Sequence, residues 1–346
     1  MKLLNMIIIF VCGAHSASCQ QIEEMSYELA AEAVDEQGKP LEGIQVITGR
    51  LEVMGGGTDI MAKPVTTKPV STDAHGKAII RFKSLPEPEG NMSFYQDGYY
   101  STRQKFEWTR PDGFDGKTRE AAVKAILKPI KNPIPMIARK DIRIRTPKFN
   151  VVYGFDLEMG ESLPPLGNGK NADIEFILSG SRKDLGYEEK EHIDFKMIIR
   201  CPNPDDGFVE FLIDDSLEFG KGSVLPSGHE CPETGYVNSL FRHYRNDNDG
   251  GMVESHRIRH EDRNKCAYFR ISTRKDQSGK ITSAHYGKIY GPLEIRPAFK
   301  QHGHYDNTAQ GGFFMQYTYF NPTANDRNVE FDPCQNLLPG GNITRP

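Results

Sequence analysis

Two histidines four residues apart are the first residues in this 346-residue sequence whose type and spacing could do chemistry. His256 and His260 would lie on one face of a helix, and zinc sites use this spacing. Arg257 and Arg259 lie between them and would repel a cation, and the glutamate that follows the first histidine of a zinc-protease motif is absent. We therefore interpret the segment as a charge-rich loop and predict no metal there. A metal held by the two histidines is the alternative.

Asp247 and Asp249 belong to an Asn-, Asp- and Gly-rich segment that partly resembles a calcium-binding loop. The calcium-binding loop of an EF-hand requires an aspartate at its first position and a glutamate at its twelfth, where this chain has Arg245 and His256. The same residue types are typical of a turn that joins two strands. We favour the turn, and an irregular calcium site at Asp247 and Asp249 is the alternative.

Motifs for nucleophilic, nucleotide-dependent or redox catalysis are absent from the sequence. No Gly-x-Ser-x-Gly elbow, phosphate-binding loop or dinucleotide fingerprint follows a predicted strand. A glycosidase needs only two carboxylates about 5–10 Å apart. Nothing in the sequence selects one such pair among the 47 acidic residues. We therefore predict no catalytic residue and no cofactor.

The charge balance argues against nucleic acid and anionic membranes as partners. The chain has 43 basic and 47 acidic residues, which gives a net charge of −4, and the two signs are interspersed. Without a basic patch there is no electrostatic attraction to phosphate groups. The 33 glycines and 22 prolines, together with the lack of a long apolar helical period, favour many short strands.

Residues 1–18 are typical of a secretion signal. Lys2 gives a positive start, residues 3–12 are almost entirely apolar, and small residues precede a cleavage point after Ser18. The apolar stretch is about half the length that crosses a bilayer, so we expect export and no transmembrane segment in the mature chain. Cys19 could be acylated, although the residues before it fit that signal poorly. We predict a periplasmic or extracellular protein, with a lipid-anchored outer-membrane lipoprotein as the alternative.

Four cysteines follow Cys19, and all lie in the C-terminal half: Cys201, Cys231, Cys266 and Cys334. An exported chain meets an oxidising compartment, and an even number of cysteines suggests disulfide bonds. Their spacings match no short motif, and free buried cysteines are ordinary core residues. The sequence predicts at least one disulfide with its pairing left open, and free cysteines are the alternative.

A five-residue phrase, Asp-x-x-Gly-Lys, occurs three times, at residues 35–39, 73–77 and 276–280. Its aspartate can accept hydrogen bonds from backbone amides within the turn, and its glycine can take positive φ without Cβ strain. Together they close a tight antiparallel turn. We therefore predict hairpins at both ends of the chain. The glycines expected to have positive φ are Gly38, Gly76 and Gly279.

Alternation of apolar and polar residues predicts strands in much of the chain. Residues 193–201 alternate strictly, residues 174–178 follow the same period, and residues 313–320 form the last strong strand. Residues 208–213 are almost continuously apolar, which predicts a strand buried on both faces. The best candidate for a short helix is residues 254–265, although it has no apolar stripe.

The first unit of the chain spans residues 24–130, where a series of short strands predicts a β-sandwich. Residues 34–46, 71–77 and 97–100 resemble the carboxypeptidase regulatory-like domain, a transthyretin-like, immunoglobulin-type sandwich that is common in exported bacterial proteins. The resemblance covers roughly a third of the chain and rests on turn motifs. It implies an accessory or spacer module without catalytic residues.

A proline-rich segment at residues 131–136 predicts a hinge after this unit, because Pro133 and Pro135 fix φ and remove hydrogen-bond donors. Residues 137–333 then predict a larger antiparallel β-sandwich, and residues 334–346 a C-terminal tail. The fold predicted from the sequence is therefore all-β, with two successive sandwiches.

Residues 287–291 and 321–333 are similar to segments of uncharacterised exported bacterial proteins that carry this N-terminal module. That similarity implies a location but no activity. We predict an exported, non-catalytic binding or structural module of the cell envelope or the extracellular space. Its partner would be a glycan, whose rings can stack on aromatic side chains, or another envelope protein. The alternative is a secreted polysaccharide-acting hydrolase with its site in residues 137–333.

Overall fold

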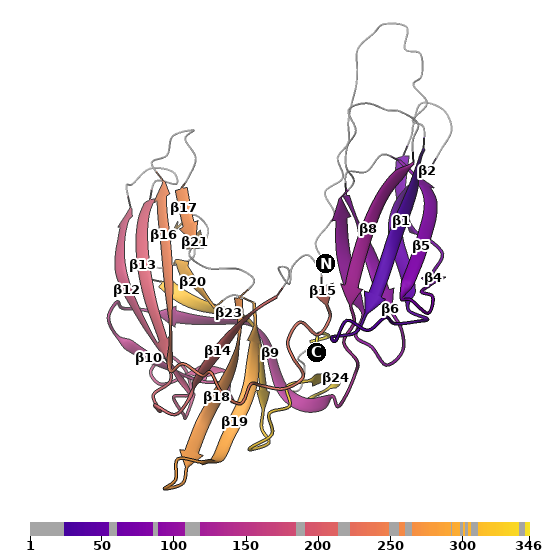
Figure 1. Cartoon of the computed structure of the whole chain (residues 1–346). Helices are drawn as coiled ribbons and strands as arrows, with labels where there is room; N and C mark the ends of the chain where they lie inside the picture. The colour runs from indigo at the N-terminus through magenta and orange to yellow at the C-terminus, as the bar shows by residue number, and fades with distance from the viewer. Residues whose placement is uncertain are drawn as a thin grey trace, which may run out of the picture.

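The chain is built from strands. The computed structural model describes residues 24–54, 61–85, 89–107, 118–184, 191–213, 222–248, 256–259, 265–291, 293–297, 300–301, 304–305, 311–338 and 343–346. Within these ranges there is no helix, and the strands form several sheets, which confirms the predicted all-β, sandwich-type class (Figure 1). Among the described residues, accordingly, no helix is long and apolar enough to cross a membrane.

Eight strands form the N-terminal sandwich: β1 (Met25–Val34), β2 (Gln45–Met54), β3 (Met61–Thr66), β4 (Val70–Ser71), β5 (Lys77–Ser84), β6 (Glu89–Tyr95), β7 (Thr102–Glu107) and β8 (Arg119–Ile126). One sheet has the order β5-β1-β8, and the other joins β7, β6, β2 and β3 with β4 beside β2. Alternate side chains of β1 are buried and share one core with Val46 and Phe94 of the facing sheet. The two sheets thus bury their apolar faces on each other.

The remaining strands are β9 (Ile134–Thr146), β10 (Val152–Asp156), β11 (Glu161–Ser162), β12 (Ile174–Asp184), β13 (Glu191–Arg200), β14 (Gly207–Leu212), β15 (Gly222–Ser223), β16 (Ser239–Asn248), β17 (His256–Arg259), β18 (Lys265–Lys275), β19 (Ile281–Tyr290), β20 (Glu294–Pro297), β21 (Lys300–Gln301), β22 (His304–Tyr305), β23 (Gly311–Asn321) and β24 (Phe331–Asn336). One large sheet has the order β11-β10-β12-β13-β16-β17. The other has the order β14-β18-β19-β23-β9-β24, with β20 beside β23.

Two separate cores stabilise these large sheets. The first contains Phe176 and Phe195 of one sheet and Phe269 and Phe313 of the other. The second contains Tyr290, Tyr319 and Phe331 and belongs to the sheet that includes β9. Strand β9 serves both, because Met136 and Ala138 lie in the second core and Ile142 and Ile144 in the first. The boundary between the two cores therefore crosses β9 near its middle.

Two local predictions are wrong in the described residues. The segment 208–213 is not buried on both faces, because β14 is an edge strand and its Leu212 side chain is 65% exposed. The helix expected within residues 254–265 is also absent where the structure describes the segment. Residues 256–259 form β17, which pairs antiparallel with β16, so sheet pairing outweighs a weak helical pattern that had no apolar stripe.

The repeated phrase folds as the sequence predicts. Gly38, Gly76 and Gly279 have φ values of 81°, 71° and 84°, in the left-handed region that favours glycine. In each turn the aspartate Oδ1 accepts hydrogen bonds from the amides two and four residues later; the aspartates are Asp35, Asp73 and Asp276. The local sequence therefore determines these turns.

Several contacts hold the junction between the two sandwiches, and one set of them involves a buried carboxylate. Glu330, only 1% exposed, accepts hydrogen bonds from the Tyr100 hydroxyl and from the amides of Lys131 and Asn132. Strand β9 begins within the predicted hinge, at residue 134. In addition, β15 pairs with β7, so a segment of the second unit extends a sheet of the first.

Candidate binding site at the bend of strand β9

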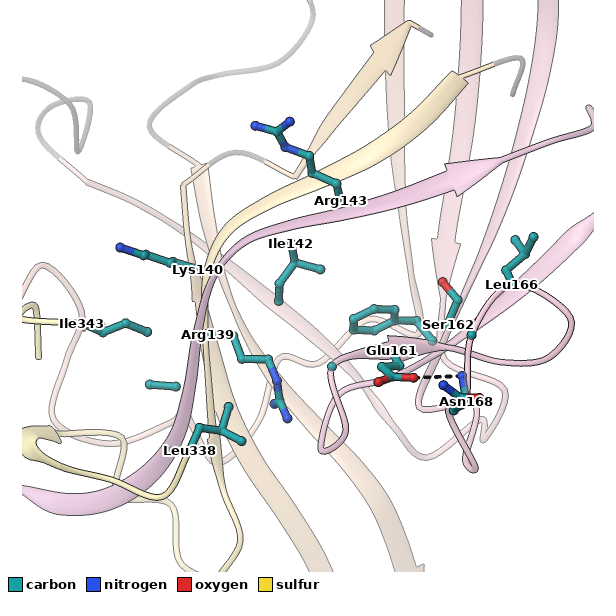
Figure 2. Close-up of a pocket in the computed structure, with 14 residues that line it drawn as sticks. Arg139, Lys140, Ile142, Arg143, Glu161, Ser162, Leu166, Asn168, Leu338 and Ile343 are labelled. Atoms are coloured by element: carbon teal, nitrogen blue, oxygen red, sulfur yellow. Dashed lines mark hydrogen bonds between the residues drawn. The ribbon is translucent and has the colours of Figure 1, made fainter. Parts of the chain in front are cut away.

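A hollow with a volume of about 740 Å³ lies where β9 passes between the two cores (Figure 2). Its apolar lining comes from both sides of that boundary. Ile142 and Phe155 belong to the first core, whereas Ala138 and Ile343 belong to the second. The volume falls within the range of about 300–1,000 Å³ that is typical of small-ligand sites. This hollow is therefore the candidate functional site.

A single lysine interrupts the burial pattern of β9 at the hollow. Even-numbered residues of β9 from 136 to 146 are buried except Lys140, which is exposed at the point where neither core covers the strand. The next residue, Asp141, has a φ of 56°, a conformation that non-glycine residues seldom adopt. Such outliers gather at functional sites, where the surrounding fold holds them. The strand thus changes its conformation at the wall of the hollow.

The loop opposite β9 is fixed by hydrogen bonds. The Arg139 guanidinium donates to the carbonyl oxygens of Leu157 and Glu158, and burial lowers the pKa of this arginine from its usual value. A Cβ on Gly160 would lie 2.2 Å from Arg139 Nε, so only glycine permits this approach. Glu161 Oε2 accepts from the Asn168 amide at 2.9 Å (Figure 2). The wall of the hollow is therefore preorganised.

Two aspartates, the buried Asp156 and the half-buried Asp173, hold the same loop. The Asp156 carboxylate accepts the backbone amides of Met159, Lys170 and Asn171. Asp173 accepts the amide of Leu157, and burial raises the pKa of its carboxyl to about 7. These carboxylates bind the backbone rather than face the hollow.

Three polar groups of the hollow have no hydrogen-bond partner among the described residues: the Lys140 ammonium, the Ser162 hydroxyl and the Asn168 carboxamide. Apolar residues also line the hollow, so a ligand with several hydroxyl groups could bind these polar groups while it contacts the apolar lining. Glu161 is the one carboxylate among the described lining residues.

A second hollow, of about 750 Å³, lies over β1, β5 and β8 in the N-terminal sandwich. Its polar side chains are mostly engaged already. Glu32 is 2.9 Å from Lys124, the Ser71 hydroxyl accepts from Gln45, and Asp73 accepts two amides of its own turn. It therefore offers fewer groups to a ligand than the hollow at β9.

A buried lysine forms the other unusual polar cluster. Lys288 is 0% exposed, and its Nζ donates to Ser227 Oγ at 3.2 Å and to the Tyr290 hydroxyl at 2.7 Å. Burial lowers the pKa of Lys288 well below its usual value and raises the pKa of Tyr290. A serine beside a lysine whose pKa is lowered resembles a nucleophile and its base. However, Ser227 is only 1% exposed, so a substrate does not reach it, and the cluster is structural.

We expect Lys288→Met to raise the free energy of unfolding by about 1–3 kcal/mol near neutral pH, because it removes an amine that burial disfavours and retains the volume. At pH values between the lowered pKa of Lys288 in the folded protein and its pKa in the unfolded chain, the unfolded chain binds more protons than the folded protein. The contribution of Lys288 to wild-type stability therefore rises with pH. The difference between the variant and the wild type should therefore shrink as pH rises. Urea unfolding of both proteins from about pH 6 to pH 9 measures it.

The thiols of Cys231 and Cys266 also make stability depend on pH, so the comparison needs both proteins at each pH. Burial raises the pKa of Cys231 and Cys266 to about 12. These thiols therefore lower the free energy of unfolding in alkali, in the wild type and in Lys288→Met alike. Only the difference in unfolding free energy between the two proteins reports on Lys288. The same change at the exposed Lys39 should leave stability nearly unchanged. A Lys288→Met variant that is less stable than wild type at every pH would contradict this account.

Two of the four residues that the sequence offered for metal binding lie outside the described residues. These are His260 and Asp249, whereas His256 and Asp247 belong to the paired strands β17 and β16. Among the described residues, no group of three or more His, Cys, Asp or Glu side chains is arranged to hold a metal. Residues 1–18 and Cys19 also lie outside the described residues.

The predicted disulfide is absent, because all four cysteines are free. Cys201 is buried in the first core, and Cys334 is exposed on β24. Cys231 and Cys266 share the second core, but the first donates to the Gly287 carbonyl oxygen and the second accepts from the Gly291 amide. Cys201 and Cys334 thus lie away from this core, and the two thiols that share it interact with separate backbone groups.

The residues that make the hollow were not selected from the sequence. Lys140, Ser162 and Asn168 belong to no motif; Ser162 lies on the short strand β11, which pairs with β10, and Asn168 lies on the loop that follows β11. One signal was present. In the alternating pattern Met136, Ala138, Lys140, Ile142, a lysine takes an otherwise apolar position.

No family model and no curated protein matches this chain. Among solved structures, a 3-chlorocatechol 1,2-dioxygenase from Rhodococcus opacus 1CP is similar over 35% of this chain and 70% of its own, with 12% identity and a TM-score of 0.23. A DUF3823 family protein from Parabacteroides merdae ATCC 43184 matches 86% of this chain and 100% of its own, with 10% identity and a TM-score of 0.17.

A third solved structure is a protein of unknown function from Bacteroides fragilis NCTC 9343, described as a candidate membrane-associated protein. It matches 87% of this chain and 99% of its own, with 11% identity and a TM-score of 0.16. At such low TM-scores these similarities assign neither a family nor an activity to this chain.

Proposed function

We propose that this protein is an exported, non-catalytic binding module that takes a segment of carbohydrate in the hollow at the bend of β9. The observation that carries the proposal is the set of three unpartnered polar groups, on Lys140, Ser162 and Asn168, in a hollow that also has an apolar lining. Sugar rings present hydroxyl groups at their edges and apolar C–H groups on their faces. A site with polar edges and an apolar base complements both.

The N-terminal sandwich acts in this proposal as an accessory module that spaces or presents the second unit. Support for this role is its resemblance to carboxypeptidase regulatory-like domains, together with the paired polar groups over its own hollow. Export rests on the leader at residues 1–18. The protein would therefore act in the periplasm, at the cell surface or outside the cell.

A glycan array combined with a hydrolysis assay on the mature chain tests this function. We expect binding to at least one glycan without release of new reducing ends. The double variant Ser162→Ala, Asn168→Ala should weaken that binding about tenfold or more, since it removes two hydrogen bonds of about 0.5–1.5 kcal/mol each.

The matched control is Asn91→Ala, an exposed asparagine on β6 of the other sandwich, which should bind like the wild type. Failure to bind any glycan would contradict the proposal. Hydrolysis of a bound glycan would replace it with the polysaccharide-acting enzyme.

A further inference from the structure

A row of apolar side chains crosses the outer face of the sheet that contains β10, β12, β13 and β16. Val152 pairs with Ile177, Ile177 with Ile198, and Ile198 with Phe241, so the four lie side by side on neighbouring strands. Val152, Ile198 and Phe241 are 46%, 43% and 58% exposed. With strands about 4.8 Å apart, this apolar row is roughly 14 Å long. Exposed large apolar residues usually occur singly, so a contiguous row indicates an interaction surface.

Charged residues border the apolar row on both sides. On one side, two residues along the strands from the row, Glu175 on β12 pairs with Arg200 on β13. Their charged side chains are 2.8 Å apart. On the other side, Ser179 pairs with Lys196, and Lys196 with His243. A border of both signs excludes a partner that carries a single strong charge and suits one that presents both signs.

We infer that the partner is a second copy of this chain, docked face to face about a two-fold axis that runs parallel to the strands between β12 and β13. This axis places Ile177 of one copy against Ile198 of the other, and Val152 against Phe241. It also places Glu175 against Arg200 of the second copy, so both apolar and charged groups meet their complements. An interface between identical surfaces needs this self-complementarity. Sheets that pack face to face in sandwiches do so about 10 Å apart with closely aligned strands.

The charges select this axis over the other face-to-face arrangement. A two-fold axis along the apolar row would instead place Arg200 of one copy opposite Lys196 of the other, and two like charges would repel. Aliphatic residues also dominate the row, and such side chains are suited to packing against another sheet surface. The face is separate from the hollow, because Val152 points outward where Phe155 on the same strand is buried.

The expected dimer is weak. Strands about 4.8 Å apart and contacts along roughly 25 Å of their length give about 1,000 Å² buried in total, near the lower limit for a specific interface. The chain should therefore exchange between monomer and dimer, and the dimer should increase with protein concentration.

Sedimentation velocity of the mature chain over a wide concentration range tests this inference. We expect a reversible dimer that Ile198→Asp or Phe241→Asp abolishes. Leu212→Asp is the matched control, because that leucine is 65% exposed on β14 of the other sheet and should leave the dimer intact. A chain that stays monomeric at every concentration, or a dimer that survives both aspartate substitutions, would overturn the inference.

Charge reversal tests the axis and does not depend on the apolar variants folding. Glu175→Arg should weaken the dimer about tenfold or more by opposing two arginines, and adding Arg200→Glu should restore it. An effect of Glu175→Arg without rescue would refute this axis. If the protein stays monomeric and its apolar row binds a glycan, the face is a glycan-binding surface and the dimer is overturned. Neither result bears on the hollow, which Ser162→Ala and Asn168→Ala address separately.

Discussion

Glu330→Ala is expected to lower the free energy of unfolding by about 3–5 kcal/mol, because it leaves three donors at a buried junction without their acceptor. Glu330 Oε1 accepts from the Tyr100 hydroxyl at 2.8 Å and from the Lys131 amide at 2.9 Å, and Oε2 accepts from the Asn132 amide at 2.8 Å. Each bond involves a charged acceptor that is 1% exposed, which makes it stronger than an ordinary surface contact. Urea unfolding measures the loss.

Two variants control for this effect. Glu330→Gln keeps the volume and one acceptor oxygen, so we expect it to lose only part of the stability. Glu233→Ala removes an acid whose side chain is 77% exposed and should change stability by about 0.5 kcal/mol or less. Because Glu330 joins both units, Glu330→Ala should also separate their unfolding into two transitions. Equal losses for Glu330→Ala and Glu233→Ala would contradict the role given to this carboxylate.

Gly76→Ala is expected to cost about 3 kcal/mol, through two effects that act together. The glycine has a φ of 71°, and forcing a Cβ into left-handed space costs roughly 1–2 kcal/mol. In addition, the new Cβ would lie 2.4 Å from the Ala33 carbonyl oxygen, so backbone atoms must move, at a cost of about 1–3 kcal/mol.

Two glycines of the same phrase provide matched controls for Gly76. Gly38 and Gly279 have positive φ, but a Cβ on either would meet no atom within 4 Å. Their alanine variants should therefore lose only about 1 kcal/mol, as expected from backbone conformation alone. Thermal or urea unfolding of the three variants compares them. Three equal losses would show that the contact with Ala33 has no energetic consequence.

Local patterns predicted much of this fold because their causes lie within a few residues. The Asp-x-x-Gly-Lys turns form through contacts two and four residues apart, as Asp73 shows with the amides of His75 and Lys77. Strict alternation in residues 193–201 likewise predicted β13, since one face of a half-buried strand must be apolar.

What the sequence did not reveal depends on contacts between distant residues. Glu330 binds the Lys131 amide across 199 positions, and no local pattern marks a carboxylate for that role. The apolar run 208–213 predicted burial on both faces, but only the order of strands in the sheet places β14 at an edge. The hollow also depends on distant contacts, because it lies where β9 passes from one core to the other.

A titration of the isotope-labelled mature chain with the oligosaccharides that it binds, followed by NMR, tests the assignment of the hollow most directly. We expect the amide signals of Lys140, Ser162 and Asn168 to shift together with one dissociation constant, while signals from β1, β5 and β8 stay in place. Shifts confined to those three strands, or a bound sugar that leaves the bend of β9 unperturbed, would contradict the proposed binding site.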